Sequence, residues 1–189
     1  MLPGGNSPKV FLNELSNYNI NWNKISLIAT DERVVPLTSN NSNTGMIKRE
    51  LVDRIENKDK PQLMELYPKK KKDIENKLKL LEKYFYNNIP KIAFLGIGED
   101  GHTAGIFKAK TTKDNCYLVK NLAEPYHRIT ISMNLLIRVP YLIFFVLGSN
   151  KKKSLQKTLF NENNKKFLPA RFLLKHGFGE KIILCDREA

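Results

Sequence analysis

The sequence predicts an α/β fold: a single Rossmann-like domain over residues 1–189, with a largely parallel sheet flanked by helices. Apolar runs typical of buried strands alternate along the chain with segments whose apolar residues recur at helical spacing. The chain has 189 residues, 41% of them hydrophobic, and both values fit one domain with a sizeable core.

The strands are expected where short apolar runs are bounded by polar or turn-forming residues. Several of these runs are rich in isoleucine, leucine and phenylalanine, as buried strands of a parallel sheet are. In chain order, the runs lie at residues 25–29, 92–95, 129–132, 141–147 and 181–184.

The helices are expected where apolar residues repeat every three or four positions. One helix should begin near Asn43 or Thr44, with Ser42 and Asn43 as capping candidates. A second, amphipathic helix should cover residues 73–86, with Ile74 and Phe85 on its apolar face. Further helices are expected at residues 152–159 and around residues 170–175.

The charge balance limits the possible partners. The chain carries 32 Lys and Arg against 19 Asp and Glu, a net charge of +13 that would attract any polyanion. The excess is mostly lysine and comes with many asparagines, a pattern that a biased genome also produces. RNA-reading aromatic motifs and zinc-finger spacings are missing from the sequence. We therefore expect small anionic substrates and no dedicated nucleic-acid partner.

Membrane insertion and secretion are not expected. The longest apolar stretch, residues 141–147, is far shorter than the ~20 residues that span a bilayer, and the N-terminus lacks signal-peptide features. Cys116 and Cys185 fit neither a disulfide framework nor a metal-ligand spacing. The expected protein is cytoplasmic, with reduced thiols, no metal and no membrane partner.

The most informative segment follows the expected strand at residues 92–95. It places Asp100 and His102 two residues apart among glycines, at a point where the chain leaves the sheet. A histidine there can act as a general base or acid if a carboxylate fixes its tautomer. Glycines and aspartates also serve ordinary tight turns, so the pattern alone leaves a purely structural turn possible.

Two other segments carry potential anion ligands. The Asp31-Glu32-Arg33 triplet follows the expected strand at residues 25–29. It is either an internal salt bridge or a place where Arg33 grips a phosphate. The N-terminal loop contains Gly4, Gly5, Asn6 and Ser7 and precedes an amphipathic stretch, so its amides could face an anion at a helix N-terminus.

Taken together, these segments resemble the 6-phosphogluconolactonase family, within the group that includes glucosamine-6-phosphate isomerases and deaminases. The resemblance covers essentially the whole chain, with six motifs in the family's order. They are the glycine loop at residues 4–8, the DER-x-VP segment at 31–36, Ser42-Asn43, the G-x-G-x-DGHTA segment ending at Ala104, Arg128-Ile129-Thr130, and Gly148 with Lys151.

The resemblance implies hydrolysis of 6-phospho-D-glucono-1,5-lactone in the oxidative pentose phosphate pathway, without metal or cofactor. His102 is expected to activate water and later protonate the leaving ring oxygen, with Asp100 as its orienter. Backbone amides of residues 98–103 are expected to hold the oxyanion. The expected phosphate and substrate ligands are Gly4, Gly5, Asn6, Ser7, Arg33, Ser42, Asn43, Arg128 and Lys151.

The sequence departs from the family pattern at its start. The family has a helix and a first strand before the glycine loop, whereas Met1 stands almost on that loop here, and Pro3 and Asn6 replace more typical serines. Either the start is truncated or this member is unusually short. If that first strand is missing, the loop loses its anchor and the sheet loses an inner neighbour. Gly105 and Lys108 also replace a common Ser and Pro.

Two alternatives stay open. A glucosamine-6-phosphate deaminase or isomerase would share the fold and much of the phosphate site, although Arg33 after Asp31-Glu32 and Thr103-Ala104 after the histidine favour the lactonase. An inactive sugar-phosphate-binding protein is the third possibility. The expected assembly is a monomer or a weak homodimer.

Overall fold

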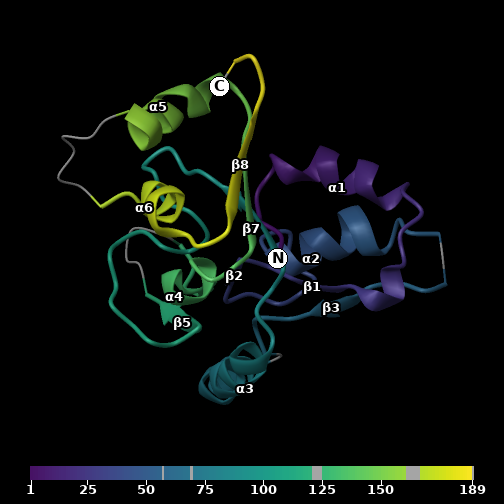
Figure 1. Ribbon diagram of the computed structural model, residues 1–189. Helices are drawn as coiled ribbons and strands as arrows, with labels where there is room; N and C mark the ends of the chain where they lie inside the picture. Colours follow the sequence, from purple (N-terminus) through teal and green to yellow (C-terminus); the bar gives the residue numbers. More distant parts are fainter. Residues whose placement is uncertain (57, 69, 121–124, 161–166, 189) are drawn as a thin grey trace.

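Parallel strands form the centre of the molecule (Figure 1). The computed structural model describes residues 1–56, 58–68, 70–120, 125–160 and 167–188. One parallel sheet has the order β4 (Ile92–Gly96), β7 (Tyr141–Val146), β8 (Glu180–Cys185). A second parallel pair joins β1 (Ser26–Ile28) to β3 (Gln62–Met64). These runs are rich in branched and aromatic residues, which suit a pleated, buried surface.

The backbone of Met1 and Leu2 lies between these two parallel sheets. Leu2 pairs in parallel with Ala29, and its amide donates to the Ile28 carbonyl at 2.9 Å. On the other side, the Phe94 amide donates to the Met1 carbonyl at 3.0 Å. These two residues thus connect β1 with β4 and hold the start of the glycine loop that follows.

A third sheet is antiparallel, with the order β2 (Asp31–Arg33), β6 (Arg128–Ile131), β5 (Cys116–Val119). The prediction of a largely parallel sheet is therefore confirmed for β4-β7-β8 and for β1-β3. It does not hold for the third sheet, in which both strand pairs are antiparallel. The apolar run that forms β6 does not reveal whether the strand pairs in a parallel or an antiparallel way. Strand direction depends on how the connecting segments lead the chain back to the sheet.

The helices flank the parallel strands. In Figure 1, α5 (Lys152–Phe160) and α6 (Pro169–His176) lie on one side of β7 and β8, and α1 (Pro8–Ser16) lies on the other. Phe11 of α1 packs its ring against Phe94 and Phe145, with centroids 5.0 and 4.9 Å away. Burial of such rings stabilises the sheet–helix contact by about 1.5–3 kcal/mol per fully buried side chain.

The remaining helices have local signals at their ends. α2 (Asn43–Ile47) is capped by Ser42, whose hydroxyl accepts from the Gly45 amide at 2.9 Å, and it continues into a π-helical turn (Lys48–Val52). The expected helix at residues 73–86 is α3 (Ile74–Asn87), and α4 (Met133–Leu136) is a short turn capped by Ser132. Short 3-10 turns occupy Trp22–Lys24, Lys71–Asp73 and Ser149–Lys151.

The structure contains all five expected strands and three that the sequence analysis missed, namely β2, β3 and β5. The missed strands are three or four residues long: β2 consists of charged residues and β3 begins with a glutamine, whereas β5 is a short apolar run, Cys116–Val119, that the sequence analysis overlooked. Among the described residues, the longest helices fall short of the length and apolar content that a membrane span requires.

Candidate active site

A cavity of about 600 Å³ opens where β1 and β4 end. Its walls come from Pro3 and the glycine loop at residues 4–8, from β2, and from the end of β4 with the segment that follows it. Thr30, Asn43, Arg128, Phe145 and Lys151 also line it. The chain thus places its polar motifs at the carboxyl ends of parallel strands, the common ligand-binding place in open α/β sheets.

The glycine loop is held against α2. A Cβ atom on Gly4 would lie 2.1 Å from Oδ1 of Asn43, so any side chain at residue 4 would displace the Asn43 side chain. Gly5 has a φ of +90°, a conformation that glycine adopts without strain. Among the described residues, the amides of residues 4–7 donate no hydrogen bond within the chain. They line the cavity just before α1 begins at Pro8 and are available to an anion.

Glu32 organises the start of α2. Its buried carboxylate accepts hydrogen bonds from the amides of Asn43 and Thr44, at 2.8 and 2.7 Å, and from the Ser42 hydroxyl at 3.0 Å. This negative charge at a helix N-terminus is favourable. Ser42 is itself buried and does not line the cavity. The structure therefore places this expected substrate ligand behind the wall, where it positions Asn43.

Arg33 reaches the cavity beside Asn43. Its Nη1 donates to Oδ1 of Asn43 at 3.2 Å and to the carbonyl of Asn41 at 3.0 Å. Among the described residues it forms no ion pair with Asp31 or Glu32, so the internal salt bridge considered for this triplet is not formed. The neutral contacts leave the guanidinium's charge uncompensated and suited to an anionic ligand.

Asp31 pairs instead with Arg128. Nη1 of Arg128 lies 2.9 Å from Oδ2 of Asp31, and their side chains are only 12% and 6% exposed. Because β2 and β6 are adjacent strands, residues 97 positions apart face the same cavity. The guanidinium carbon also lies 5.7 Å from the centroid of the Phe107 ring. The pair keeps Arg128 fixed, and part of its charge is compensated before any ligand binds.

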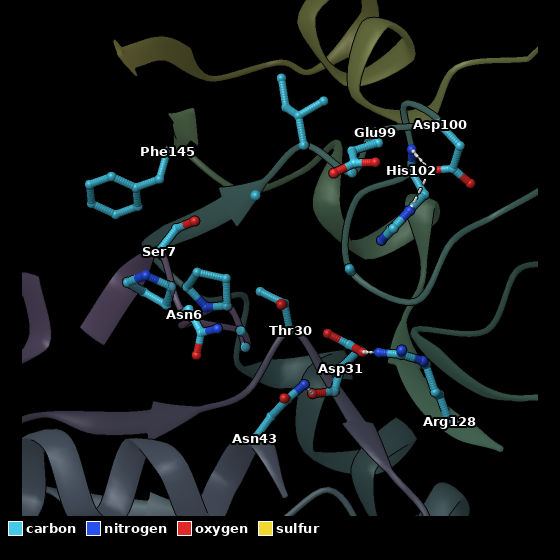
Figure 2. A pocket seen from close by; sticks show the side chains of 18 of the residues that line it. Asn6, Ser7, Thr30, Asp31, Asn43, Glu99, Asp100, His102, Arg128 and Phe145 are labelled. Carbon is cyan, nitrogen blue, oxygen red and sulfur yellow. Dashed lines mark hydrogen bonds and ion pairs between the residues drawn. The ribbon is translucent and has the colours of Figure 1, made fainter. Parts of the chain in front are cut away.

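His102 and Asp100 form a close pair on the opposite wall from Asn6 and Ser7 (Figure 2). The Nδ1 atom of His102 lies 2.5 Å from Oδ1 of Asp100, and the His102 amide donates to the same oxygen at 3.1 Å. A carboxylate at Nδ1 favours the tautomer with its proton there, which leaves the Nε2 lone pair for another partner. The contact between these residues that the sequence left open is therefore formed.

The pKa of Asp100 reflects two opposing effects. Desolvation raises the pKa of this carboxyl, but the hydrogen bonds from the side chain and amide of His102 outweigh it, and the pKa falls below its usual value of 3.8. Asp100 is therefore an anion at neutral pH. It can stabilise an imidazolium formed when His102 accepts a proton.

Glycines shape the turn that carries His102. The Gly98 amide donates to the His102 carbonyl at 2.8 Å, and the Gly101 amide donates to the Gly98 carbonyl at 2.9 Å. A Cβ on Gly98 would lie 2.2 Å from the imidazole, and Gly101 has a φ of +85°. The amides of residues 98, 101 and 102 are thus already donors inside the turn. Of the amides of residues 98–103 that the sequence analysis expected to hold the oxyanion, these three are therefore engaged inside the turn.

Lys151 enters the cavity from the turn before α5. Gly148 starts this turn with a φ of +94°, and its amide donates to Oδ2 of Asp186 at 2.8 Å. Nδ2 of Asn150 donates to Oε1 of Glu99 at 3.0 Å, which ties the turn to the segment after β4. Lys151 and His102 therefore line one cavity although 49 positions separate them in the sequence.

Sequence reasoning missed several lining residues, including Thr30, Asp31, Glu99, Phe107 and Phe145. The position of Asp31 directly after an expected strand could have indicated a site residue, but its partner Arg128 could not be read from the sequence. The aromatic residues had no such signal, since isolated phenylalanines are mostly core residues. Among the described residues, no three His, Cys, Asp or Glu side chains gather as a metal site.

Known proteins are similar to this chain over most of its length. The family described as glucosamine-6-phosphate isomerases/6-phosphogluconolactonase matches residues 1–183. A 6-phosphogluconolactonase from Helicobacter pylori is 31% identical over 176 residues, which cover 90% of this chain and 76% of that protein.

Solved structures share the fold. A 6-phosphogluconolactonase from Thermotoga maritima is 25% identical with a TM-score of 0.79, over 97% of this chain and 82% of that one. A monomeric glucosamine-6-phosphate deaminase is 20% identical with a TM-score of 0.80, over 99% of this chain and 86% of that one. The two TM-scores are nearly equal, so the backbone alone does not separate the two activities.

Proposed function

This chain belongs to the glucosamine-6-phosphate isomerase/6-phosphogluconolactonase family, and on that premise we propose that it is a 6-phosphogluconolactonase. It hydrolyses 6-phospho-D-glucono-1,5-lactone to 6-phosphogluconate in the oxidative pentose phosphate pathway. The observation that carries this proposal is the His102–Asp100 pair, which lies across one cavity from a glycine loop with unused amides.

The mechanism needs one imidazole. Nε2 of His102 removes a proton from a water molecule as the water oxygen attacks the lactone carbonyl carbon, and Asp100 stabilises the resulting imidazolium. When the tetrahedral intermediate collapses, the bond from that carbon to the ring oxygen breaks and His102 returns the proton to this oxygen. One water is added across the ester, and the enzyme ends in its starting state.

The phosphate end of the substrate is bound away from the imidazole. The amides of residues 4–7 offer converging donors, and Arg33, Arg128 and Lys151 supply positive charge. Asn43 fixes Arg33 through its Oδ1 atom, and Ser42 acts indirectly by capping α2. Because the amides of Gly98, Gly101 and His102 already donate inside the turn, the oxyanion is assigned to the remaining amides of residues 98–103.

The principal rival is glucosamine-6-phosphate deamination, favoured only by the shared fold. Loss of 6-phosphogluconolactone above its spontaneous rate should be followed beside ammonia release from glucosamine 6-phosphate. We expect catalysis in the first assay alone. Ammonia release without lactone hydrolysis would replace our proposal with the rival, and inactivity in both assays would favour an inactive sugar-phosphate-binding protein.

The proposal extends to the state of the protein. We take residues 1–189 to be a single domain, located in the cytoplasm, that exists as a monomer or weak homodimer and needs no metal or cofactor. Limited proteolysis, cell fractionation, sedimentation velocity and assays in the presence of a chelator test these four statements separately.

A further inference from the structure

A second cavity of about 300 Å³ lies beside the first, between the segment that follows Ala104 and strand β5. Phe107 lines both cavities. The centroid of its ring is 4.6 Å from that of His102, so this ring stands between the second cavity and the imidazole. The proposed lactone hydrolysis makes no use of this second cavity.

The walls of the second cavity are strongly basic. Lys108, Lys110 and Lys120 line it, and within the described chain no lining residue is acidic. None of these three ammonium groups forms an ion pair with another described residue. Three like charges around one small cavity raise its potential and favour an anionic ligand, above all one with phosphate oxygens.

One wall is also aromatic. The Nζ atom of Lys110 lies 3.9 Å from the centroid of the Tyr117 ring, over its face. Burial raises the pKa of Tyr117, so the ring is a neutral phenol at physiological pH. Such a face binds either a cation or a flat heterocycle. A heterocycle that takes the place of Lys110 would free its ammonium to meet an anion in the same cavity.

We propose that this second cavity binds a nucleoside phosphate, with the base on the face of Tyr117 and the phosphates held by Lys108, Lys110 and Lys120. A volume of about 300 Å³ lies at the lower end of small-ligand sites. The required combination, a planar ring next to a multiply charged anion, is the one that nucleotides offer.

Calorimetric titration of the full chain with ADP tests the proposal. One ADP should bind per chain with a dissociation constant below about 1 mM. Pyrophosphate lacks the ring and adenosine lacks the charge, so each should bind at least about tenfold more weakly. The substitution Arg33→Met, in the first cavity, should leave ADP affinity unchanged.

Substitutions of lining residues test whether ADP binds in the second cavity. Lys110→Met and Tyr117→Leu should each weaken ADP binding about fivefold or more. Lys113→Met is the matched control, because this exposed lysine lies on the same segment outside the cavity, and it should change affinity less than about twofold. The exposed Lys110 can be replaced without disturbing the fold, and thermal unfolding checks Tyr117→Leu.

Three results would overturn the proposal: no saturable ADP binding, ADP binding that Arg33→Met abolishes, or ADP affinity that Lys110→Met leaves intact. Pyrophosphate binding as tight as that of ADP would also overturn it, since the base would then contribute nothing. None of these results depends on whether the first cavity hydrolyses a lactone.

Discussion

Asp100 contacts His102 twice through a single oxygen: Oδ1 lies 2.5 Å from the ring Nδ1 and 3.1 Å from the backbone amide. One carboxylate oxygen therefore orients both the imidazole and the peptide that carries it. The structure links this pair to Gly98, whose missing side chain leaves the space that the imidazole occupies.

Replacing the base should abolish most of the catalysis. We expect His102→Asn to lower kcat by about 10²–10⁴, because general acid–base catalysis typically contributes that much. Binding of 6-phosphogluconate, measured by calorimetry, should stay within about twofold, since the base acts in the transition state. His176→Gln, on α6 outside the cavity, is the control. Unchanged kcat in His102→Asn would contradict the mechanism.

Gly98→Ala tests the space under the imidazole. The new Cβ would lie 2.2 Å from the ring, which must then move away from its productive place. A displacement of this kind costs about 10²-fold in kcat, while stability changes little because a side chain can yield. Thermal unfolding checks that the fold of the variant is intact. Unchanged kcat in Gly98→Ala would mean that the ring's position is not critical.

The Asp100 carboxylate should stabilise the fold in a defined pH range. Its pKa is lower in the folded protein than the ordinary value of 3.8, so its contribution is present above that value and disappears as pH falls through the folded-state pKa. The Tm of wild type should therefore exceed that of Asp100→Asn at pH 6, and the difference should shrink below pH 3.8. If the Tm difference between wild type and Asp100→Asn grew on acidification, the pKa of Asp100 would be raised in the folded protein rather than lowered.

Phosphate affinity should depend on Lys151 but not on its neighbour. Lys151→Met should weaken 6-phosphogluconate binding about tenfold, because a charge-assisted hydrogen bond to the phosphate is lost. Arg33→Met should act in the same direction. Lys152 follows Lys151 directly but does not line the cavity, so Lys152→Met serves as control and should bind normally. Comparable losses in the Lys151 and Lys152 variants would indicate only a general charge effect.

The two cysteines should differ in reactivity. Burial raises the pKa of Cys116 to about 12, with a further contribution from Glu82, whereas Cys185 is exposed. Iodoacetamide at pH 8 should therefore alkylate Cys185 alone in the folded protein and both thiols after denaturation. Mass spectrometry of the digested protein gives the answer. Rapid labelling of Cys116 in Cys185→Ser would show that β5 is not packed as described.

Much of the fold was predictable because its signals are local. Apolar runs indicated β1, β4, β6, β7 and β8, and helical periodicity indicated α3, α5 and α6. The short strand β2 has no such signal, because it consists of charged residues, and Asp31 and Glu32 become buried only when the strand pairs with β6, far along the chain. Strand direction is also not local, which is why the antiparallel third sheet was not expected.

The sequence by itself determined the order of the motifs, the family they resemble and the residue types of the site, since these depend on neighbours a few positions apart. Only the tertiary structure decided the partners. It paired Asp31 with Arg128 rather than Arg33, placed Glu32 and Ser42 behind the wall, and used three amides of the His102 turn internally. Such contacts depend on how strands and loops pack in space. The order of residues along the chain does not give the distances between residues that are far apart in the sequence.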